Sequence, residues 1–497
     1  MDIIKNILDI SLKYWKFMAA SALFLMSVSL FDRKLFLAFL FIAFLAAVAF
    51  YFIRKRNDKK FLGTLFLIAF LIHLSAVFFI YYFKFEPFGG AGDYIEYNIV
   101  AQKTAERIQR GNFSLDGIEI SHYYPIIIGY IYAFTLPDML FGQIFNAFLA
   151  ALLAVLIYLT IIEMGGSENQ GFVAGLSANF YPSLLFFGSL LLKDIVVIFL
   201  SFIVLLMTLK LIKGFSKGKF LLFYLALGVL MHFRIYVGYA GLLAFIICWP
   251  LFSDLAVKKR LKYLFIIIPL LGFLPQVFAG QGWYGIGFLS RYLNKGTITY
   301  YREMIYAPQN QVQKIQQSVI KQANEPKVQK TEPLIIKQAN EPEVQKTEPL
   351  IIKQANEPEA PKISSRGRGS SIMIKTGLEN PFTFLRNTSL SFTYAFLGPF
   401  PWQVKPPKRY FALFETIPWY VLLFFAVKGV ISHFKGHYRF FLPLLVFSFF
   451  VFGTLAVFIT NFGIITRIRM PAALAILCLF PFGLKGLNIK IPFLKKI

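Results

Sequence analysis

Residues 61–83 read FLGTLFLIAFLIHLSAVFFIYYF, a run of 23 residues that contains no Asp, Glu, Lys or Arg. About 20 helical residues are needed to cross the hydrocarbon core of a bilayer, so this run is long enough to do so. Similar runs occupy residues 35–53 and 440–459. They are rich in Phe, Leu and Ile and lack the alternation of a β-barrel strand. The pattern predicts an all-α fold, a polytopic bundle of transmembrane helices.

The composition of the whole chain also favours a membrane protein. Hydrophobic residues make up 57% of the 497 residues, against about 45–50% in a soluble domain. The formal net charge is +26, which in a soluble protein would suggest a nucleic-acid partner. Most basic residues flank the apolar runs, so we expect membrane lipids as partners and no nucleic acid. The two cysteines, Cys248 and Cys478, lie inside apolar runs and form no metal or redox motif.

Basic loops set the expected orientation of the chain. The loops 54–60, 213–219 and 258–262 are dense in Lys and Arg, and short loops of this kind stay in the cytoplasm. Placing all three inside requires a cytoplasmic N-terminus, and the basic segments 432–439 and 488–497 then also fall inside. We therefore expect a multi-pass protein of the plasma (inner) membrane, with both termini cytoplasmic and its long loops extracytoplasmic.

The apolar runs predict about twelve spans. They cover residues 15–31, 35–53, 61–83, 139–162, 171–190, 195–212, 220–233, 235–252, 263–279, 410–428, 440–460 and 470–487. The first leads into further apolar segments and lacks a clear small-residue cleavage site, so we do not expect it to be a cleaved signal peptide.

These spans divide the chain into five parts. The parts are three N-terminal spans (1–83), a first outer loop predicted to be catalytic (84–138), the core of the membrane bundle (139–279), a second outer loop (280–409), and the C-terminal spans with a basic tail (410–497). Within the first outer loop, residues 125–136 are apolar but too few to cross, which suits an interfacial or re-entrant helix. Within the second, residues 319–364 carry near-identical 16-residue repeats rich in Pro, Glu, Gln and Lys, which we expect to be disordered.

Two acidic residues stand at the outer edges of expected spans. Asp93 follows the glycine-rich turn at 89–92, and Asp194 follows Lys193 in a tight turn between the fifth and sixth spans. A carboxylate at this boundary can take a proton from an attacking hydroxyl or amine, or bind a metal ion. Each also has a simpler interpretation: Asp93 as a helix cap, and Asp194 as half of a loop charge pair that ends two helices.

Three arginines are expected on the same outer side as the two carboxylates. Arg234 interrupts an apolar stretch next to His232, and Arg467 and Arg469 lie in the last outer loop. Arg234 alone could extend toward water as a snorkelling side chain. Short outer loops normally avoid arginine, however, and the guanidinium fork suits a phosphate. Together the arginines predict an anionic partner, such as a lipid phosphate or diphosphate.

Several short motifs between residues 89 and 212 follow one another in a recognisable order. They are G-D-Y-I-E-Y at 92–97 with Ala101 behind it, Y-Y-P at 123–125, then Gly175, Pro182 and K-D at 193–194. In this order they resemble the GT-C superfamily of polyprenyl-phosphate-dependent glycosyltransferases, to which protein O-mannosyltransferases and lipid A aminoarabinose transferases belong.

The resemblance implies a multispan helical bundle with an outward-facing active site and a sugar donor on a polyprenyl phosphate or diphosphate. It also implies that Asp93 is the catalytic acidic residue of the first outer loop and that Asp194 is a second one. If the reaction uses a divalent metal, these two carboxylates would be its candidate ligands; no other cofactor is predicted. The family often has a paired acidic motif where this chain has Asp93-Tyr94, and two extra spans precede the loop here.

The sequence thus predicts an enzyme, an integral membrane glycosyltransferase that moves a sugar from a polyprenyl-phosphate donor to a glycan, lipid or protein acceptor. The predicted catalytic residues are Asp93 and Asp194. The predicted substrate-binding residues are Glu96, Tyr97, His122, Tyr123, Lys193, His232, Arg234, Arg467 and Arg469. Two alternatives stay open: a lipid-linked polysaccharide polymerase or ligase and, in a different class, a lipid-glycan flippase or other transporter.

Overall fold

The computed structural model is all-α in the residues that it describes, which are 27, 32–85, 93–114, 123–272, 294–299, 377–378, 380–400, 411–459 and 462–484. Its helices are α2 (Arg33–Ile53), α3 (Lys59–Phe83), α4 (Asp93–Gln109), α5 (Tyr124–Phe134), α6 (Met139–Glu163), α7 (Glu168–Asn179), α8 (Pro182–Gly188), α9 (Asp194–Lys213), α10 (Lys217–Phe233), α11 (Ile235–Phe252), α12 (Val257–Gly272), α15 (Lys295–Thr299), α17 (Pro381–Leu397), α18 (Phe411–Phe458), α19 (Phe462–Ile468), α20 (Met470–Leu477) and α21 (Phe480–Gly483).

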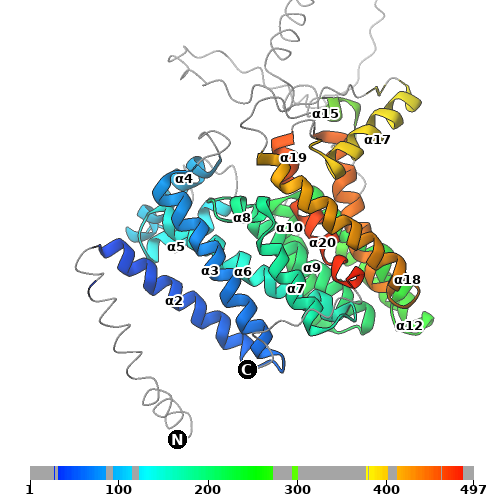
Figure 1. Ribbon diagram of the computed structural model, residues 1–497, viewed down its shortest axis with the longest axis horizontal. Helices are drawn as coiled ribbons and strands as arrows, with labels where there is room; N and C mark the ends of the chain where they lie inside the picture. Colours follow the sequence, from blue (N-terminus) through cyan, green and yellow to red (C-terminus); the bar gives the residue numbers. More distant parts are fainter. Residues whose placement is uncertain are drawn as a thin grey trace, which may run out of the picture.

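The chain is a multi-pass helical membrane protein. Within the described residues, six helices are long and apolar enough to cross a bilayer: α2, α3, α6, α9, α11 and most of α18. The first five coincide with predicted spans. The short apolar helix α5 lies where residues 125–136 predicted a helix too short to cross. In Figure 1, α2 and α3 form one edge of the bundle, and α17 and α18 lie on the opposite side.

Helix α18 covers two predicted spans, 410–428 and 440–460, in one element of 48 residues. Near its start, Glu415 pairs with Arg469, which precedes α20; further on, the Ser448 hydroxyl donates to the Ala472 carbonyl in α20. A straight helix would separate residues 415 and 448 by about 50 Å at 1.5 Å per residue. Because both lie beside the first turn of α20, the helical path must turn back between them. The predicted basic connection at 432–439 lies in this interval.

Three of the other predicted spans differ from the structure. Residues 171–190 form two helices, because α7 ends at Asn179 and α8 begins at Pro182. Proline disfavours helical geometry in the residue before it, and Tyr181 is extended there, with φ −69° and ψ 114°. The described part of the predicted span 263–279, residues 263–272, belongs to α12, which begins earlier at Val257. Of the predicted span 470–487, the described residues 470–484 are divided between α20 and α21.

Several predictions fall outside the described residues. They are the first span at 15–31 apart from one residue, the repeats at 319–364, the basic tail at 488–497 and His122.

Two ends of the bundle are distinguished by their charges. At the end of α6, Glu163 pairs with Lys210 and Lys213 of α9. Close by, the ring of His437 hydrogen-bonds the Met164 carbonyl, and Arg439 pairs with Asp254. We call this the basic end, because four of the five predicted cytoplasmic segments gather there. The opposite end, about 37 Å away along the 25 residues of α6, holds the predicted site. Which end faces the cytoplasm stays a prediction.

Candidate active site

Four predicted site residues from four separate segments of the chain meet at the end of the bundle opposite the basic end. Arg467 in α19 donates from Nη1 to Asp93 Oδ2 at 2.9 Å and from Nε to Asp194 Oδ2 at 2.5 Å. Arg234, between α10 and α11, donates from Nη2 to the other oxygen of Asp194. Asp93 and Arg467 lie 374 residues apart in the chain. We call Asp93, Asp194, Arg234 and Arg467 the carboxylate–arginine cluster.

The four side chains of this cluster differ in how far they are exposed to solvent. The side chain of Asp194 is 3% exposed and that of Arg234 is 10% exposed. Arg467 is 19% exposed and Asp93 is 52% exposed. Asp93 is therefore the member that a solute or a lipid headgroup can reach, while Asp194 is held below it by two guanidinium groups.

A buried lysine adds charge to the cluster. Lys193 immediately precedes Asp194 and is buried with it. Burial and, to a smaller extent, the nearby positive charge of Arg234 lower the pKa of Lys193 to about 8. At neutral pH Lys193 is still mostly protonated, so three cations face two carboxylates. This excess positive charge favours an anionic ligand.

A tyrosine and an asparagine outside the predicted set extend the site. The Arg234 Nη1 atom donates to the hydroxyl of Tyr236 at 2.8 Å. On α6, the buried Asn146 donates from Nδ2 to the carbonyls of Leu190 (2.6 Å) and Leu192 (3.1 Å) and accepts from the Tyr124 hydroxyl (2.9 Å). Asn146 therefore holds the turn that immediately precedes Lys193 and Asp194, and so positions these two residues.

The same asparagine ties together the two carboxylate-bearing segments. The ring of Tyr124 packs edge-on against Tyr97 at 5.7 Å between centroids, and Tyr97 lies one turn after Asp93 on α4. Asn146 thus links α4 to the start of α9 through Tyr124. Amide side chains in an apolar span are a signal for a functional or structural polar site, and this signal could have drawn attention to Asn146 and Gln143 in the sequence.

Replacing Asn146 by Leu is expected to lower the free energy of unfolding by at least about 2 kcal/mol. The change leaves the Tyr124 hydroxyl and the Leu192 carbonyl buried without their partner, at about 1–3 kcal/mol each, while the Leu190 carbonyl still accepts from the Leu192 amide at 2.8 Å. Titration of the purified protein with SDS in mixed micelles measures the loss. Gln143→Leu, three residues earlier on α6, is the matched control, because the buried Oε1 of Gln143 has no hydrogen-bond partner among the described residues. Equal losses in both variants would contradict the role given to Asn146.

The remaining predicted residues lie around this centre at varying distances. Glu96 is exposed on the first turn of α4, and Tyr97 is buried behind it. Tyr123, which is exposed, packs edge-on against His232 with 6.0 Å between ring centroids. These two rings come from α10 and from the residue before α5, so the structure brings them together without placing them in the carboxylate–arginine cluster.

Arg469 does not join the other arginines, contrary to the sequence prediction. Its side chain is 1% exposed and its Nη2 atom lies 2.7 Å from Glu415 Oε1. The hydroxyls of Tyr181 and Ser183 also donate to Glu415. Residues two apart on a helical path point about 200° away from each other, so Arg467 and Arg469 face different neighbours. Arg469 joins helices to one another and is not accessible to a phosphate.

The donor set does not favour a divalent metal at this site. Within the described residues, no group of three or more His, Cys, Asp or Glu side chains could hold a metal ion. Both carboxylates of the cluster are already engaged by guanidinium groups, which a cation would have to displace. No step of the reaction below is therefore assigned to a metal.

Comparison of the chain with known protein families and with curated protein sequences finds no match in either.

Proposed function

We propose that this chain is an integral membrane glycosyltransferase and that the carboxylate–arginine cluster is its active site. The donor is a sugar on a polyprenyl phosphate, and the acceptor is a hydroxyl or amine on a glycan, lipid or protein outside the cytoplasm. The observation that carries the proposal is the position of Arg467, which holds an exposed and a buried carboxylate together. The GT-C resemblance of residues 89–212 adds the class of donor.

The proposed reaction is a direct displacement at the anomeric carbon. Asp93, the exposed carboxylate, accepts the proton of the attacking hydroxyl or amine as the new glycosidic bond forms. The bond between the anomeric carbon and the phosphate oxygen breaks, and its electron pair leaves with the polyprenyl phosphate. Arg234, Arg467 and Lys193 stabilise the negative charge that develops on this leaving group. Asp194 orients both arginines, and the product has the inverted anomeric configuration.

The most direct test supplies radiolabelled polyprenyl-phosphate monosaccharides to the purified full chain in lipid nanodiscs with candidate acceptors. We expect release of polyprenyl phosphate together with a new glycosidic bond of inverted configuration. Translocation of a lipid-linked glycan across sealed vesicles without any new bond would instead establish a flippase. Transfer only from lipid-linked oligosaccharides would establish a polymerase or ligase.

Donor affinity is expected to weaken as the pH rises through about 8. Below this value Lys193, whose pKa burial lowers to about 8, is protonated and attracts the donor phosphate; above it the side chain becomes neutral. A phosphodiester donor does not itself titrate in this range. The KM for the donor is measured from about pH 6.5 to about pH 9.5, a range that extends roughly 1.5 pH units to each side of this pKa. Over this range the KM should rise roughly 5- to 10-fold, because one charge-assisted hydrogen bond to the donor phosphate is lost.

Two substitutions separate this effect from a general change in the protein. Lys193→Arg keeps the charge at every pH in the range and should abolish the rise in KM. Lys193→Met should give a high KM that no longer depends on pH. An unchanged pH profile in Lys193→Met would show that another group is responsible.

A further inference from the structure

Two cavities flank the turn between α2 and α3, at the basic end and away from the candidate active site. The first, of about 650 Å³, is lined by Phe52, Lys55, Arg56, Asn57, Asp58 and Glu168. The second, of about 480 Å³, is lined by Ala47, Phe50, Tyr51, Ile53, Arg54 and Lys59. The two cavities share the same turn but differ in charge, and this difference decides what each can bind.

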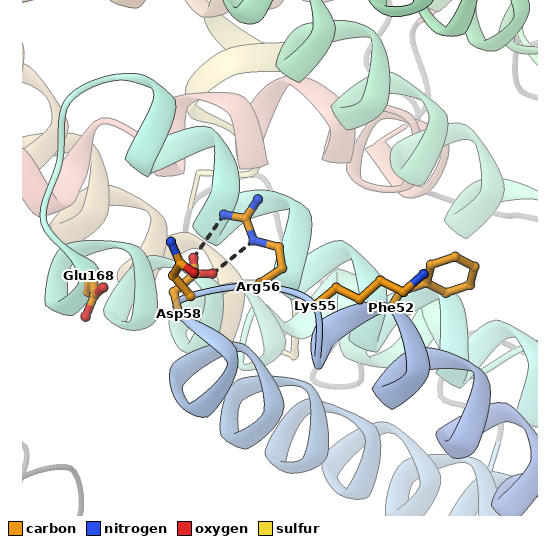
Figure 2. Close-up of a pocket in the computed structure, with 6 residues that line it drawn as sticks. Phe52, Lys55, Arg56, Asp58 and Glu168 are labelled. Atoms are coloured by element: carbon orange, nitrogen blue, oxygen red, sulfur yellow. Dashed lines mark hydrogen bonds and ion pairs between the residues drawn. The ribbon is translucent and has the colours of Figure 1, made fainter. Parts of the chain in front are cut away.

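The first cavity contains its own counter-charges. Arg56 donates to both oxygens of Asp58 at 2.9 and 3.2 Å, so this arginine is already neutralised. Figure 2 shows Phe52 and Lys55 on one side of this ion pair and Glu168 on the other. With two carboxylates against two cations, the first cavity has no net attraction for an anion.

The second cavity has cations and no carboxylate in its lining. Arg54 and Lys59 are exposed, and no carboxylate in the described part of the chain lies within ion-pair distance of either. The guanidinium of Arg54 lies over the ring of Tyr51, 4.4 Å from its centroid. This contact holds the arginine at the rim of the cavity, with donors left for a phosphate.

The position of this cavity on α2 indicates a lipid as its occupant. Helix α2 has 21 residues and a mean hydropathy of 2.7 in its most apolar window, of which 22% is buried within the protein. Its length of about 31 Å matches the hydrocarbon core of a bilayer, so the turn that follows lies at the level of the headgroups. Ala47 and Phe50 line the cavity on the helix side, where an acyl chain would continue along α2.

We propose that the cavity lined by Tyr51, Arg54 and Lys59 binds the phosphate of an anionic membrane phospholipid, whose acyl chains lie along α2. The proposal is independent of the glycosyltransferase reaction, because the cavity lies at the opposite end of the bundle. Zwitterionic lipids carry a compensating cation close to the phosphate and are bound less well.

The test measures lipid retained by the full chain. The protein is purified from mixed vesicles of phosphatidylglycerol and phosphatidylcholine, and bound lipid is quantified by native mass spectrometry across a titration. Arg54→Gln/Lys59→Gln should weaken phosphatidylglycerol binding roughly 10- to 30-fold, the effect of losing two cations near an anionic headgroup. Phosphatidylcholine binding should stay unchanged.

A matched control neutralises two other exposed lysines at the basic end, Lys258 and Lys259 of α12. Lys258→Gln/Lys259→Gln should bind phosphatidylglycerol like the unmodified protein, and the charge-preserving Arg54→Lys/Lys59→Arg should retain most of the binding. Full retention in Arg54→Gln/Lys59→Gln would overturn the proposal. An equal loss in the α12 control would also overturn it, because it would show general surface attraction in place of a defined site.

Discussion

Replacing Asp93 by Asn should lower the rate of sugar transfer by about 10²- to 10⁴-fold, the usual contribution of a general base. The amide keeps the size of the side chain and can still accept a hydrogen bond from Arg467, which now lies 2.9 Å from Asp93. It cannot accept the proton of the acceptor. We expect kcat to fall while the KM for the donor changes little, because the phosphate is bound by the arginines and Lys193.

The control for this prediction is Glu106→Gln, which neutralises an exposed carboxylate further along α4. Transfer should be unaffected in this variant. Both proteins should elute as the same single species during purification. A loss of activity in Asp93→Asn then does not come from misfolding. A fully active Asp93→Asn protein would remove Asp93 from the reaction.

Replacing Glu415 by Ala should lower the free energy of unfolding by about 3–5 kcal/mol, as expected when one member of a buried ion pair is removed. Arg469 is 1% exposed and Glu415 is 7% exposed, so water cannot replace the lost carboxylate. The same change leaves the hydroxyls of Tyr181 and Ser183 without their acceptor. Titration with SDS in mixed micelles measures the effect.

A surface pair on the same protein supplies the comparison. Glu163 pairs with Lys210 and Lys213, and all three side chains are at least a quarter exposed. Exposed pairs contribute about 0–1 kcal/mol, so Glu163→Ala should cost no more than that. The double variant Glu415→Leu/Arg469→Met, which removes both charges together, should be more stable than Glu415→Ala, because no uncompensated charge stays buried. A cost for Glu415→Ala no larger than for Glu163→Ala would contradict the buried pair.

The sequence carried enough information to predict the helices and the members of one cluster. Runs such as 61–83 need no tertiary information, because length and apolarity alone predict a span. Asp93, Asp194, Arg234 and Arg467 could be grouped because loop charges order the spans, and the order of spans places four distant residues on one side. That reasoning predicts on which side of the membrane the residues lie, however, and not the distances between their side chains.

Other features depend on directions around helix axes that loop charges do not specify. Arg467 and Arg469 are two residues apart in one loop, yet one meets Asp93 and the other meets Glu415. Asn146 is one of two amides in an apolar helix, and its role depends on the carbonyls of a turn more than 40 residues away. The turn within α18 was expected from its basic segment, but its continuous helical geometry was not.

Binding of the free polyprenyl monophosphate tests the central claim most directly, because this product is common to every sugar donor and every acceptor. We expect saturable binding to the purified full chain in nanodiscs, weakened at least about tenfold by Arg234→Gln. Arg386→Gln, which neutralises an exposed arginine of α17 outside the cluster, should bind as tightly as the unmodified protein. Absence of saturable binding, or equal affinity in Arg234→Gln and the unmodified protein, would contradict a lipid-phosphate site at the carboxylate–arginine cluster.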